Sequence, residues 1–592
     1  MKHITAVPIL LITCASFASA AYAQQPPDVV QSDPHNNTAM GAGALQANYL
    51  GTDNTAAGAS TLINNTNGSS NTALGSNALV HNSTGNDNTA SGWGALFENS
   101  TGSDNTSMGV NSLNLSNGDS NTAIGAFALA KDTSGSYNTA VGENAMESNT
   151  TGQTNTATGF YALIHNTTGN NNVVTGALGL YANTTGSNNV AAGYQALNSN
   201  TTGSNNVAAG YQALTANITG NSNTASGHQA LFRNTAGEVN AAFGYQALYS
   251  NTTGGDNTAA GAAALFYNTT GGANTAAGFE ALVSNTSGNN NTATGWGALA
   301  TNTTGASNMA SGYTALQFNT TGNYNTAAGP QALNSNKNGN GNAASGYQAL
   351  LHNETGSNNT ALGRGALSAN THGSSNVALG YLAGNKLTTG SNNIDIGNEG
   401  VAGESGTIRI GTEGTQTAAY IAGLSGVSGG AAVLINTSTG QLGYASSSRR
   451  YKEDIRPIGE ASERLFKLHP VSFRYKKAEA GGEKPIQFGL IAEEVAQAFP
   501  ELVLNDKDGK VETVAYHLLP ALLLNELQKD RALIRAQNEK LAKMEAKLSE
   551  VSALRAEDID HRRTGQLTSV HRPEQMAPAS TRLAAAFQAG PP

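Results

Sequence analysis

Residues 257–273 read NTAAGAAALFYNTTGGA, and close copies of this 17-residue unit follow one another from about residue 36 to residue 398. The first glycine of the unit recurs every 17 residues from Gly41 to Gly397, except for one spacing of 16 between Gly109 and Gly125. A fixed period of this kind predicts a solenoid. Seventeen residues are too few for a pair of helices, and the Gly and Asn-Thr content disfavours helices. The unit fits one coil of a β-solenoid, with two short strands and two turns.

Positions within the unit suggest how each coil is built. In T-A-x-G, alternate side chains can point inward and outward, as they do along a strand. The x-x-A-L segment offers a second apolar pair, and N-T-T-G is turn chemistry because Asn and Gly tolerate positive φ. Stacking identical coils would place Asn over Asn and Thr over Thr, which permits hydrogen-bonded ladders. Because each unit has few large apolar side chains, we expect three chains to share one core.

Aromatic side chains recur at one position of the unit, directly after its first glycine. We expect them to form either a carbohydrate-binding strip or the packed seam of a trimer. They are Trp93, Tyr194, Tyr211, Tyr245, Trp296 and Tyr347. The many N-x-[ST] sequences are interpreted as ladder asparagines rather than glycosylation sites. The unit lacks the regular Asp of calcium-binding repeats, and its single Thr in T-A-x-G does not favour an ice-binding face.

The composition divides the chain in two near Ser447. Only 12% of the 592 residues are charged, and 23 of the 30 Lys and Arg residues lie from residue 447 onward. The part before Ser447 has a net charge of −11, and the part from Ser447 has a net charge of +2. The overall charge of −9 argues against a nucleic-acid binder. A single Cys excludes a disulfide scaffold or a Cys-built zinc site, and we expect no cofactor and no metal.

The first 23 residues, MKHITAVPILLITCASFASAAYA, predict a signal peptide. Lys2 supplies a basic start, a short apolar run follows, and Ala21-Tyr22-Ala23 fits the cleavage rule, with cutting before Gln24. The apolar run is too short to span a membrane comfortably, and no span is expected in the mature chain. A linker then covers residues 24–35. We therefore expect Sec-type export and a secreted or cell-surface location.

Residues 399–446 change character and predict a β neck. GTIRIG at 406–411 and AAYIAGL at 418–424 are typical of strands, since they contain β-branched and aromatic residues. VLINTSTGQLGYA at 433–445 predicts a hairpin with a Thr-Gly turn.

The segment from residue 447 to about residue 533 carries several ordered motifs. They are an S-x-x-x-x-K start, LHPVSFRY at 468–475, GLIAEEVAQAFPELV at 489–503 and YHLLPAL at 516–522. This segment resembles the C-terminal intramolecular chaperone of endosialidase-type phage tail spikes, a family of self-cleaving serine–lysine peptidases. The resemblance implies a chaperone domain over residues 447–533 that directs homotrimer formation. It also implies Ser447 as nucleophile, Lys452 as base and a cleavage site between Ser446 and Ser447.

The chemistry of such a dyad sets requirements that the residues can be tested against. A serine is a poor nucleophile until a base removes its proton. A lysine serves as that base when burial or nearby positive charge lowers its pKa, and Arg449 and Arg450 could supply that charge. The family has Asp directly after the nucleophile, whereas this chain has Ser448, so Ser446, Ser447 and Ser448 remain alternative registers. No turnover of an external substrate is expected.

The chain after the chaperone segment predicts a coiled coil over residues 534–555. Apolar residues follow heptad spacing, which favours a trimeric seam over a lone amphipathic helix. They are Leu523, Leu527, Ile534, Leu541, Met544, Leu548 and Val551. Residues 556–592 are polar, with Ala and Pro stretches, and predict a disordered tail.

The N-T-A-x-G units also resemble the head repeats of trimeric autotransporter adhesins, which implies a β-roll over residues 36–398. Together these features predict a mainly β, homotrimeric, fibrous surface protein, either an adhesin or tail-fibre-like, with a cell-surface glycan or host surface as partner. One alternative is a secreted protein that binds or degrades polysaccharide, although no paired carboxylates recur at a fitting spacing. Another is an ice-binding or matrix protein with an inactive chaperone.

Overall fold

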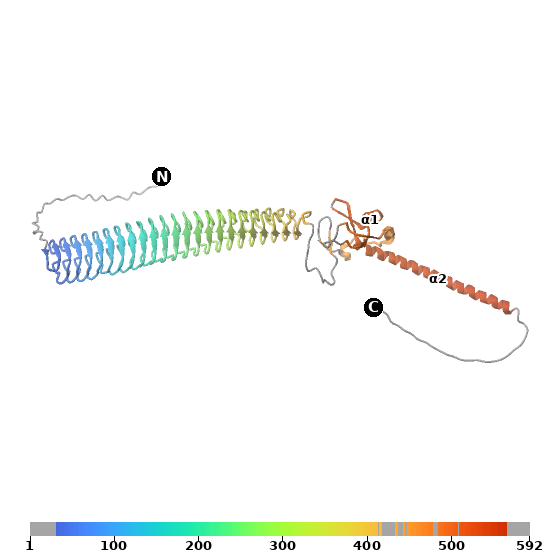
Figure 1. Cartoon of the computed structure of the whole chain (residues 1–592), viewed down its shortest axis with the longest axis horizontal. Coiled ribbons are helices and arrows are strands. Elements are labelled where there is room, and N and C mark those ends of the chain that lie inside the picture. The colour runs from blue at the N-terminus through green and yellow to red at the C-terminus, as the bar shows by residue number, and fades with distance from the viewer. Residues whose placement is uncertain are drawn as a thin grey trace, which may run out of the picture. The chain divides into compact units, whose positions relative to one another are not determined.

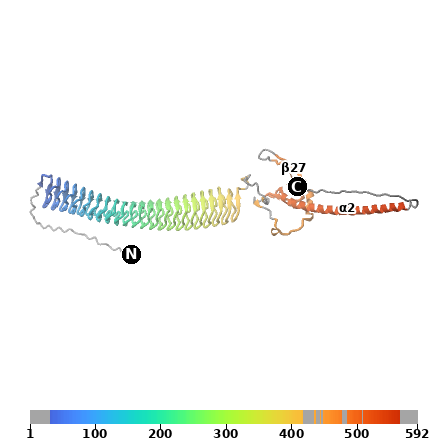
Figure 2. The ribbon, with the colours of Figure 1, turned by 90° about the horizontal axis from the view of Figure 1, so that it is seen from below.

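The computed structural model describes residues 31–412, 414–416, 433–435, 442–443, 447–476, 484–506 and 508–564. The chain divides into two compact units, Met1–Ala419 and Tyr420–Pro592. The expected signal peptide, most of the 24–35 linker, the 418–424 strand and Ser446 lie outside the described residues. The first unit is a rod of stacked coils, and the second carries a small domain and a long helix (Figures 1 and 2).

The rod is a parallel β-solenoid with one strand in each coil. Each strand pairs in parallel with the strand one repeat away, as Thr258 does with Thr275 in register, and β1 (Gln31–Ser32) is antiparallel to β2. The strands are β2 (Thr38–Met40), β3 (Thr55–Ala57), β4 (Thr72–Leu74), β5 (Thr89–Ser91), β6 (Thr106–Met108), β7 (Thr122–Ile124), β8 (Thr139–Val141), β9 (Thr156–Thr158), β10 (Val173–Thr175), β11 (Val190–Ala192), β12 (Val207–Ala209), β13 (Thr224–Ser226), β14 (Ala241–Phe243), β15 (Thr258–Ala260), β16 (Thr275–Ala277), β17 (Thr292–Thr294), β18 (Met309–Ser311), β19 (Thr326–Ala328), β20 (Ala343–Ser345), β21 (Thr360–Leu362), β22 (Val377–Leu379), β23 (Ile394–Ile396) and β24 (Ile408–Ile410).

The Ala-Leu segment of each coil is a turn, so the expectation of a second strand is wrong. The leucine takes a left-handed backbone conformation, with φ of 52° at Leu248 and similar values in the other coils. A leucine in this region costs free energy. The cost is offset because the turn aims the side chain at the axis of the coil, where Leu248 is fully buried.

The apolar core runs along the inside of the rod and is closed within a single chain. Each coil contributes the central Ala of its strand and the Ala-Leu pair of its turn, as Ala242, Ala247 and Leu248 do. All three are fully buried in one copy of the chain. The expectation that three chains share this core is therefore wrong, because small side chains fill a narrow coil without a partner.

Two buried asparagines in most coils form ladders along the rod. Asn200 Nδ2 donates to Asn183 Oδ1 at 2.9 Å and to the Gly203 carbonyl at 2.9 Å. In the other ladder, the Asn206 backbone N–H donates to Asn189 Oδ1 at 3.0 Å. These bonds satisfy backbone groups that would otherwise be buried without partners. Because the N-T-T asparagines are fully buried, the ladder interpretation of the N-x-[ST] sequences is confirmed.

The glycine after each strand permits close stacking of the coils. Gly227 has φ of +142°, and a Cβ placed there would lie 2.4 Å from the Gly244 carbonyl oxygen of the next coil. Any side chain would push the coils apart, which explains why this glycine marks the repeat so regularly.

The 16-residue coil between Gly109 and Gly125 is built differently. The residue missing from its turn coincides with Ser116 at the place of a ladder asparagine, and the next coil has Asp132 at that place. Ser116 Oγ donates to Asp132 Oδ2 at 2.8 Å, and Asn149 Nδ2 donates to Asp132 Oδ1 at 2.7 Å. Burial raises the pKa of the Asp132 carboxyl to about 7. The ladder thus continues through a serine–aspartate pair.

The solenoid ends on coils that carry charge inside. In β23 and β24, Asp395 lies in register with Arg409, at the strand position that holds Ala in most other coils. Arg409 binds Glu404 through two nitrogens. Asp395 is 1% exposed, and burial raises its pKa to about 6.

The strand expected in GTIRIG is confirmed as β24, and the hairpin expected at 433–445 is present as the antiparallel pair β25 (Leu434–Ile435) and β26 (Leu442–Gly443).

The second unit contains a small domain with two hairpins. β27 (Val471–Phe473) pairs with β28 (Gln487–Gly489), and β29 (Val503–Asn505) pairs with β30 (Val511–Val514). Helical elements are η1 (Arg449–Tyr451), η2 (Gly459–Lys467), α1 (Ala492–Ala498), η3 (Pro500–Leu502) and η4 (Tyr516–Leu518). Val495, Phe499, Leu502 and Val514 form its buried core.

The long helix α2 (Leu519–Thr564) leaves this domain. It continues beyond residue 555, so residues 556–564 are helical rather than part of the expected disordered tail. Good helix formers such as Ala, Glu and Arg extend it there. Residues 565–592 lie outside the described residues. Among the described residues, no helix is long and apolar enough to cross a membrane.

Candidate functional site

The expected dyad residues lie together at the start of the second unit. Ser448 precedes the short turn η1, which is closed by bonds from the backbone N–H of Tyr451 to the Ser448 carbonyl at 3.1 Å and from that of Lys452 to the Arg449 carbonyl at 3.1 Å. This turn brings the chain back on itself. As a result, Lys452 Nζ donates a hydrogen bond to Ser447 Oγ at 3.2 Å.

This geometry puts Lys452, the predicted base, within proton-transfer distance of Ser447, the predicted nucleophile. An amine and a hydroxyl at hydrogen-bond distance satisfy the first requirement of a serine–lysine pair. Both side chains are exposed in the single chain, whereas activation of a lysine requires burial or nearby positive charge. Of the flanking arginines, Arg450 lies over the ring of Tyr451 at 4.7 Å.

The bond expected to break is not among the described residues, because Ser446 lies outside them. The roles of Ser447 and Lys452, and the cleavage site between Ser446 and Ser447, therefore remain predictions. Ser448 caps η1 without a side-chain hydrogen bond to its turn. Because the Lys452 ammonium bonds to the hydroxyl of Ser447, the geometry favours Ser447 over Ser448 as the partner of this lysine.

A buried polar cluster ties η2 to α2. Ser462 is fully buried, and its hydroxyl donates to the Glu526 carboxylate. Asn525 Nδ2 donates to Ser462 Oγ at 2.6 Å and to the Gly459 carbonyl at 2.8 Å. Lys529 completes the cluster with an ion pair to Glu526 at 2.9 Å. The hydrogen bonds from Ser462 and Lys529 lower the pKa of Glu526. This cluster fixes the first turns of α2 against the small domain.

Sequence reasoning missed this cluster. Ser462 and Glu526 are 64 residues apart, and neither belongs to a motif whose spacing would pair them. Only the fold brings them together.

A second ion pair braces α1 and η3 against η2. The Arg464 guanidinium binds both carboxylate oxygens of Glu501, at 2.9 and 3.1 Å, and lies over the Phe499 ring at 4.0 Å. The hydrogen bonds from Arg464 lower the pKa of Glu501. Arg464 therefore joins the surface of the domain to its core.

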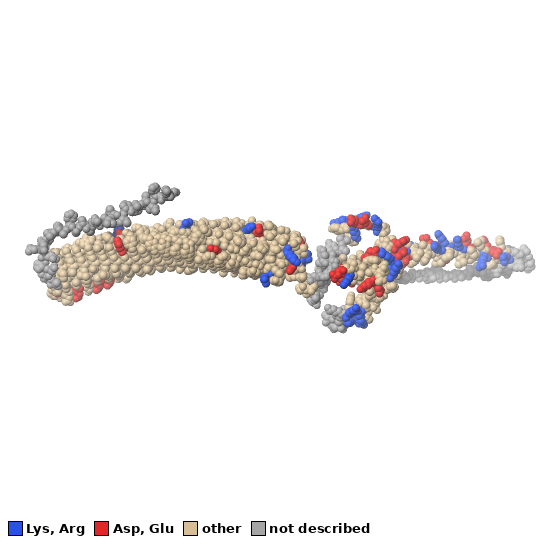
Figure 3. Space-filling view, turned by 90° about the horizontal axis from the view of Figure 1, so that it is seen from above, with Lys and Arg blue, Asp and Glu red and all other residues tan. Residues whose placement is uncertain are grey.

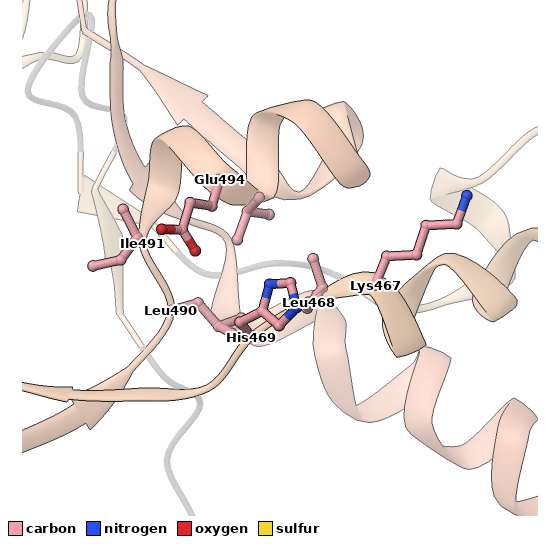
Figure 4. Close-up of a pocket in the computed structure, with 7 residues that line it drawn as sticks. Lys467, Leu468, His469, Leu490, Ile491 and Glu494 are labelled. Carbon is pink, nitrogen blue, oxygen red and sulfur yellow. The ribbon is translucent and has the colours of Figure 1, made fainter.

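A shallow hollow beside α1 contains titratable side chains (Figure 4). His469, which follows η2, and Glu494 of α1 project into it, and Leu468, Leu490 and Val495 also line it. His469 and Glu494 are exposed and make no ion pair with each other. Among the described residues, no group of His, Cys, Asp and Glu is arranged to hold a metal ion.

The helix α2 carries an apolar stripe that nothing in the single chain covers. The seven heptad residues are all exposed, namely Leu523, Leu527, Ile534, Leu541, Met544, Leu548 and Val551. Charged side chains are dense on this unit and sparse on the solenoid, in agreement with the division of charge in the sequence (Figure 3). A row of exposed apolar side chains at heptad spacing is the face of a helix that packs against other helices.

Comparison with known proteins identifies the small domain. Residues 447–504 match the family model described as chaperone of endosialidase. The resemblance predicted from the motifs is thus confirmed for this part of the chain. The match begins at Ser447 and extends through η1, η2, α1 and η3 into β29. No curated protein and no solved structure matches the chain.

Proposed function

We propose that the chain is a secreted, homotrimeric surface fibre whose chaperone domain assembles the trimer and then cuts itself from the shaft. The observation that carries the proposal is the uncovered apolar stripe of α2, directly after a chaperone domain and a long solenoid. Single helices with such a stripe associate in water because association buries the apolar side chains. Three helices fit the trimeric assembly that the chaperone family implies.

The division of labour follows from the two units. Each solenoid closes its own core and needs no partner to fold, so the shaft does not select the number of chains. The apolar stripe on α2 selects the number of chains. The Ser462–Glu526 cluster holds α2 against the domain that contains Ser447. Association through α2 would then bring together three chaperone domains, each with its own dyad.

Cleavage would proceed by attack of Ser447 on the carbonyl of residue 446. Lys452, once neutral, accepts the Ser447 hydroxyl proton as the oxygen bonds to that carbonyl carbon. It then passes the proton to the Ser447 nitrogen as the peptide bond breaks, which leaves an ester between the Ser447 oxygen and the acyl group of residue 446. Water hydrolyses this ester and frees a carboxylate on the shaft. The chaperone fragment keeps Ser447 as its N-terminal residue.

The test is expression of the chain without residues 1–23, compared with Ser447→Ala and Lys452→Ala variants on a denaturing gel. We expect the unchanged chain to yield a shaft and a smaller fragment beginning at Ser447, and both variants to stay whole. Ser448→Ala is the matched control and should still cleave. Cleavage that stops in Ser448→Ala instead would move the nucleophile by one residue.

Native mass spectrometry tests assembly separately. A trimer of uncleaved chains would mean that the chaperone domain stays attached and holds the trimer together, and it would refute the cleavage step alone. An uncleaved monomer would refute the fibre proposal. Export is tested by the N-terminal sequence of protein recovered outside the cell, which should begin at Gln24.

A further inference from the structure

One side of the solenoid carries two stacks of aromatic rings, here called the aromatic strip. Its residues stand directly after the stacking glycine. The first stack is Tyr194, Tyr211, His228 and Tyr245, with ring centroids 5.6, 5.1 and 5.3 Å apart and planes within 19° of parallel. The second stack is Phe279, Trp296 and Tyr313, with centroids 6.2 and 5.2 Å apart.

The strip faces solvent. Tyr194, Tyr211 and Tyr245 are 44%, 47% and 54% exposed, and within the described part of the chain no protein group hydrogen-bonds their hydroxyls. These exposed fractions mean that neighbouring rings leave part of each ring uncovered. The strip therefore presents a row of partly exposed aromatic rings, several of them with hydroxyl groups.

A row of glutamines runs beside the first stack. Gln212 Nε2 donates to Gln195 Oε1 at 2.8 Å, Gln229 to Gln212 at 3.0 Å and Gln246 to Gln229 at 2.9 Å. Each of the three donating amides uses one N–H in this row, which leaves its other N–H available to a ligand. No Asp, Glu, Lys or Arg occurs within three residues of any ring in the first stack.

The fold itself does not require the rings. A coil with alanine at the same position, that of Ala262, keeps the same ladders and the same buried Ala-Leu pair, here Ala264 and Leu265. The rings contribute stacking energy along the rod, but identical coils stand without them. Their repetition over consecutive coils therefore indicates a surface that acts on something outside the chain.

We propose that the aromatic strip binds an uncharged polysaccharide strand lying along the rod. Apolar faces of sugar rings pack on the exposed parts of the aromatic rings, and sugar hydroxyls bond to the tyrosine hydroxyls and glutamine amides. The first stack has no Asp, Glu, Lys or Arg beside it in sequence, which suits a neutral ligand. Its rings repeat at every coil, about 4.8 Å apart, which suits a polymer of repeating units. This inference rests on the proposed surface fibre and adds the chemical class of its ligand.

The test is native electrophoresis of the full chain in gels that contain a neutral polysaccharide, either hydroxyethylcellulose, mannan or dextran, with anionic hyaluronan for comparison. The strip variant combines Tyr194→Ala, Tyr211→Ala and Tyr245→Ala, since alanine occupies this position elsewhere in the array. The control variant combines Tyr137→Ala and Tyr324→Ala, which are 65% and 73% exposed at another position of the coil.

We expect retardation of the unchanged chain and of the control variant in at least one neutral gel. The strip variant should bind at least about tenfold more weakly, because it loses three stacking surfaces. Three results would overturn the proposal: no retardation in any neutral gel, retardation by hyaluronan alone, or equal retardation of the strip and control variants. A lower native mass of the strip variant would instead assign the strip to contact between copies of the chain and would equally overturn it.

Tryptophan fluorescence gives a second measurement of polysaccharide binding that does not depend on electrophoretic mobility. Trp93 and Trp296 are the two tryptophans of the chain, and only Trp296 stacks with other rings. In a Trp93→Phe variant, the polysaccharide that retards the chain should shift the emission of Trp296. An unchanged spectrum at saturation would place the ligand away from the second stack. Failure here leaves the cleavage and native-mass results intact, so the two proposals fail separately.

Discussion

Replacement of Asp132 by asparagine should remove a large part of the pH dependence of solenoid stability. Asp132 is fully buried in a ladder whose other members in neighbouring coils are mostly uncharged amides. It accepts hydrogen bonds from Ser116 and Asn149. These bonds lower the pKa of the carboxyl, but burial raises it more, to about 7 from 3.8.

The direction of the effect follows from this shift. A carboxyl whose pKa is raised on folding binds its proton more tightly in the folded state. Its contribution to stability is therefore fully present below the unfolded pKa of 3.8 and is lost as the pH rises through about 7. The difference between a pKa of 3.8 in the unfolded chain and about 7 in the folded chain corresponds to about 4 kcal/mol. Because asparagine does not ionise, the Asp132→Asn solenoid should lack this loss.

Urea unfolding at about pH 4 and about pH 8, followed by circular dichroism, measures the effect. The quantity of interest is the difference between the two proteins in how far the free energy of unfolding changes, because other titrating groups, including Asp395, are common to both. Hydrogen exchange of residues 105–150 would locate the loss, since a solenoid can open between neighbouring coils.

Parallel pH profiles for the two proteins would refute the reasoning. They would mean that the Asp132 carboxyl has the same pKa in the folded and unfolded chains, and that the asparagine ladder does not shield it from water. A Ser116→Ala variant gives an independent check. Loss of the Ser116 hydrogen bond, which lowers the pKa of Asp132, should move the stability loss to still higher pH.

Other predictions concern the core, the stacking of coils and the assembly. Leu248→Ala should reduce the free energy of unfolding by about 2–5 kcal/mol, whereas Leu379→Ala, at a 44% exposed site, should cost much less in the same urea titration. Gly227→Ala should separate adjacent coils, because its Cβ would lie 2.4 Å from the Gly244 carbonyl oxygen; faster hydrogen exchange confined to these coils would be the sign. Leu541→Asp should convert trimers to monomers in native mass spectra while far-UV circular dichroism keeps the solenoid signal, and a surviving trimer would show that α2 is not the seam.

The sequence alone determined the solenoid, because a 17-residue period can be satisfied only if equivalent residues stack. The period identified the ladder asparagines and the glycine that permits stacking. The ordered motifs after Ser447 identified the chaperone domain, since they are local and specific. The heptad spacing likewise placed the apolar stripe on α2.

Only the tertiary structure decided how a coil is closed. The sequence gives no sign that the core leucines adopt a left-handed backbone, a conformation that packing imposes against local preference, and so it predicted a second strand. It also predicted a core shared by three chains, because burial depends on how tightly small side chains fill a coil. The pairing of Ser462 with Glu526 and the burial of Asp132 likewise depend on distant residues that the fold brings together. Periodic and local patterns can be read along the chain, whereas burial and long-range contacts exist only once the chain is folded.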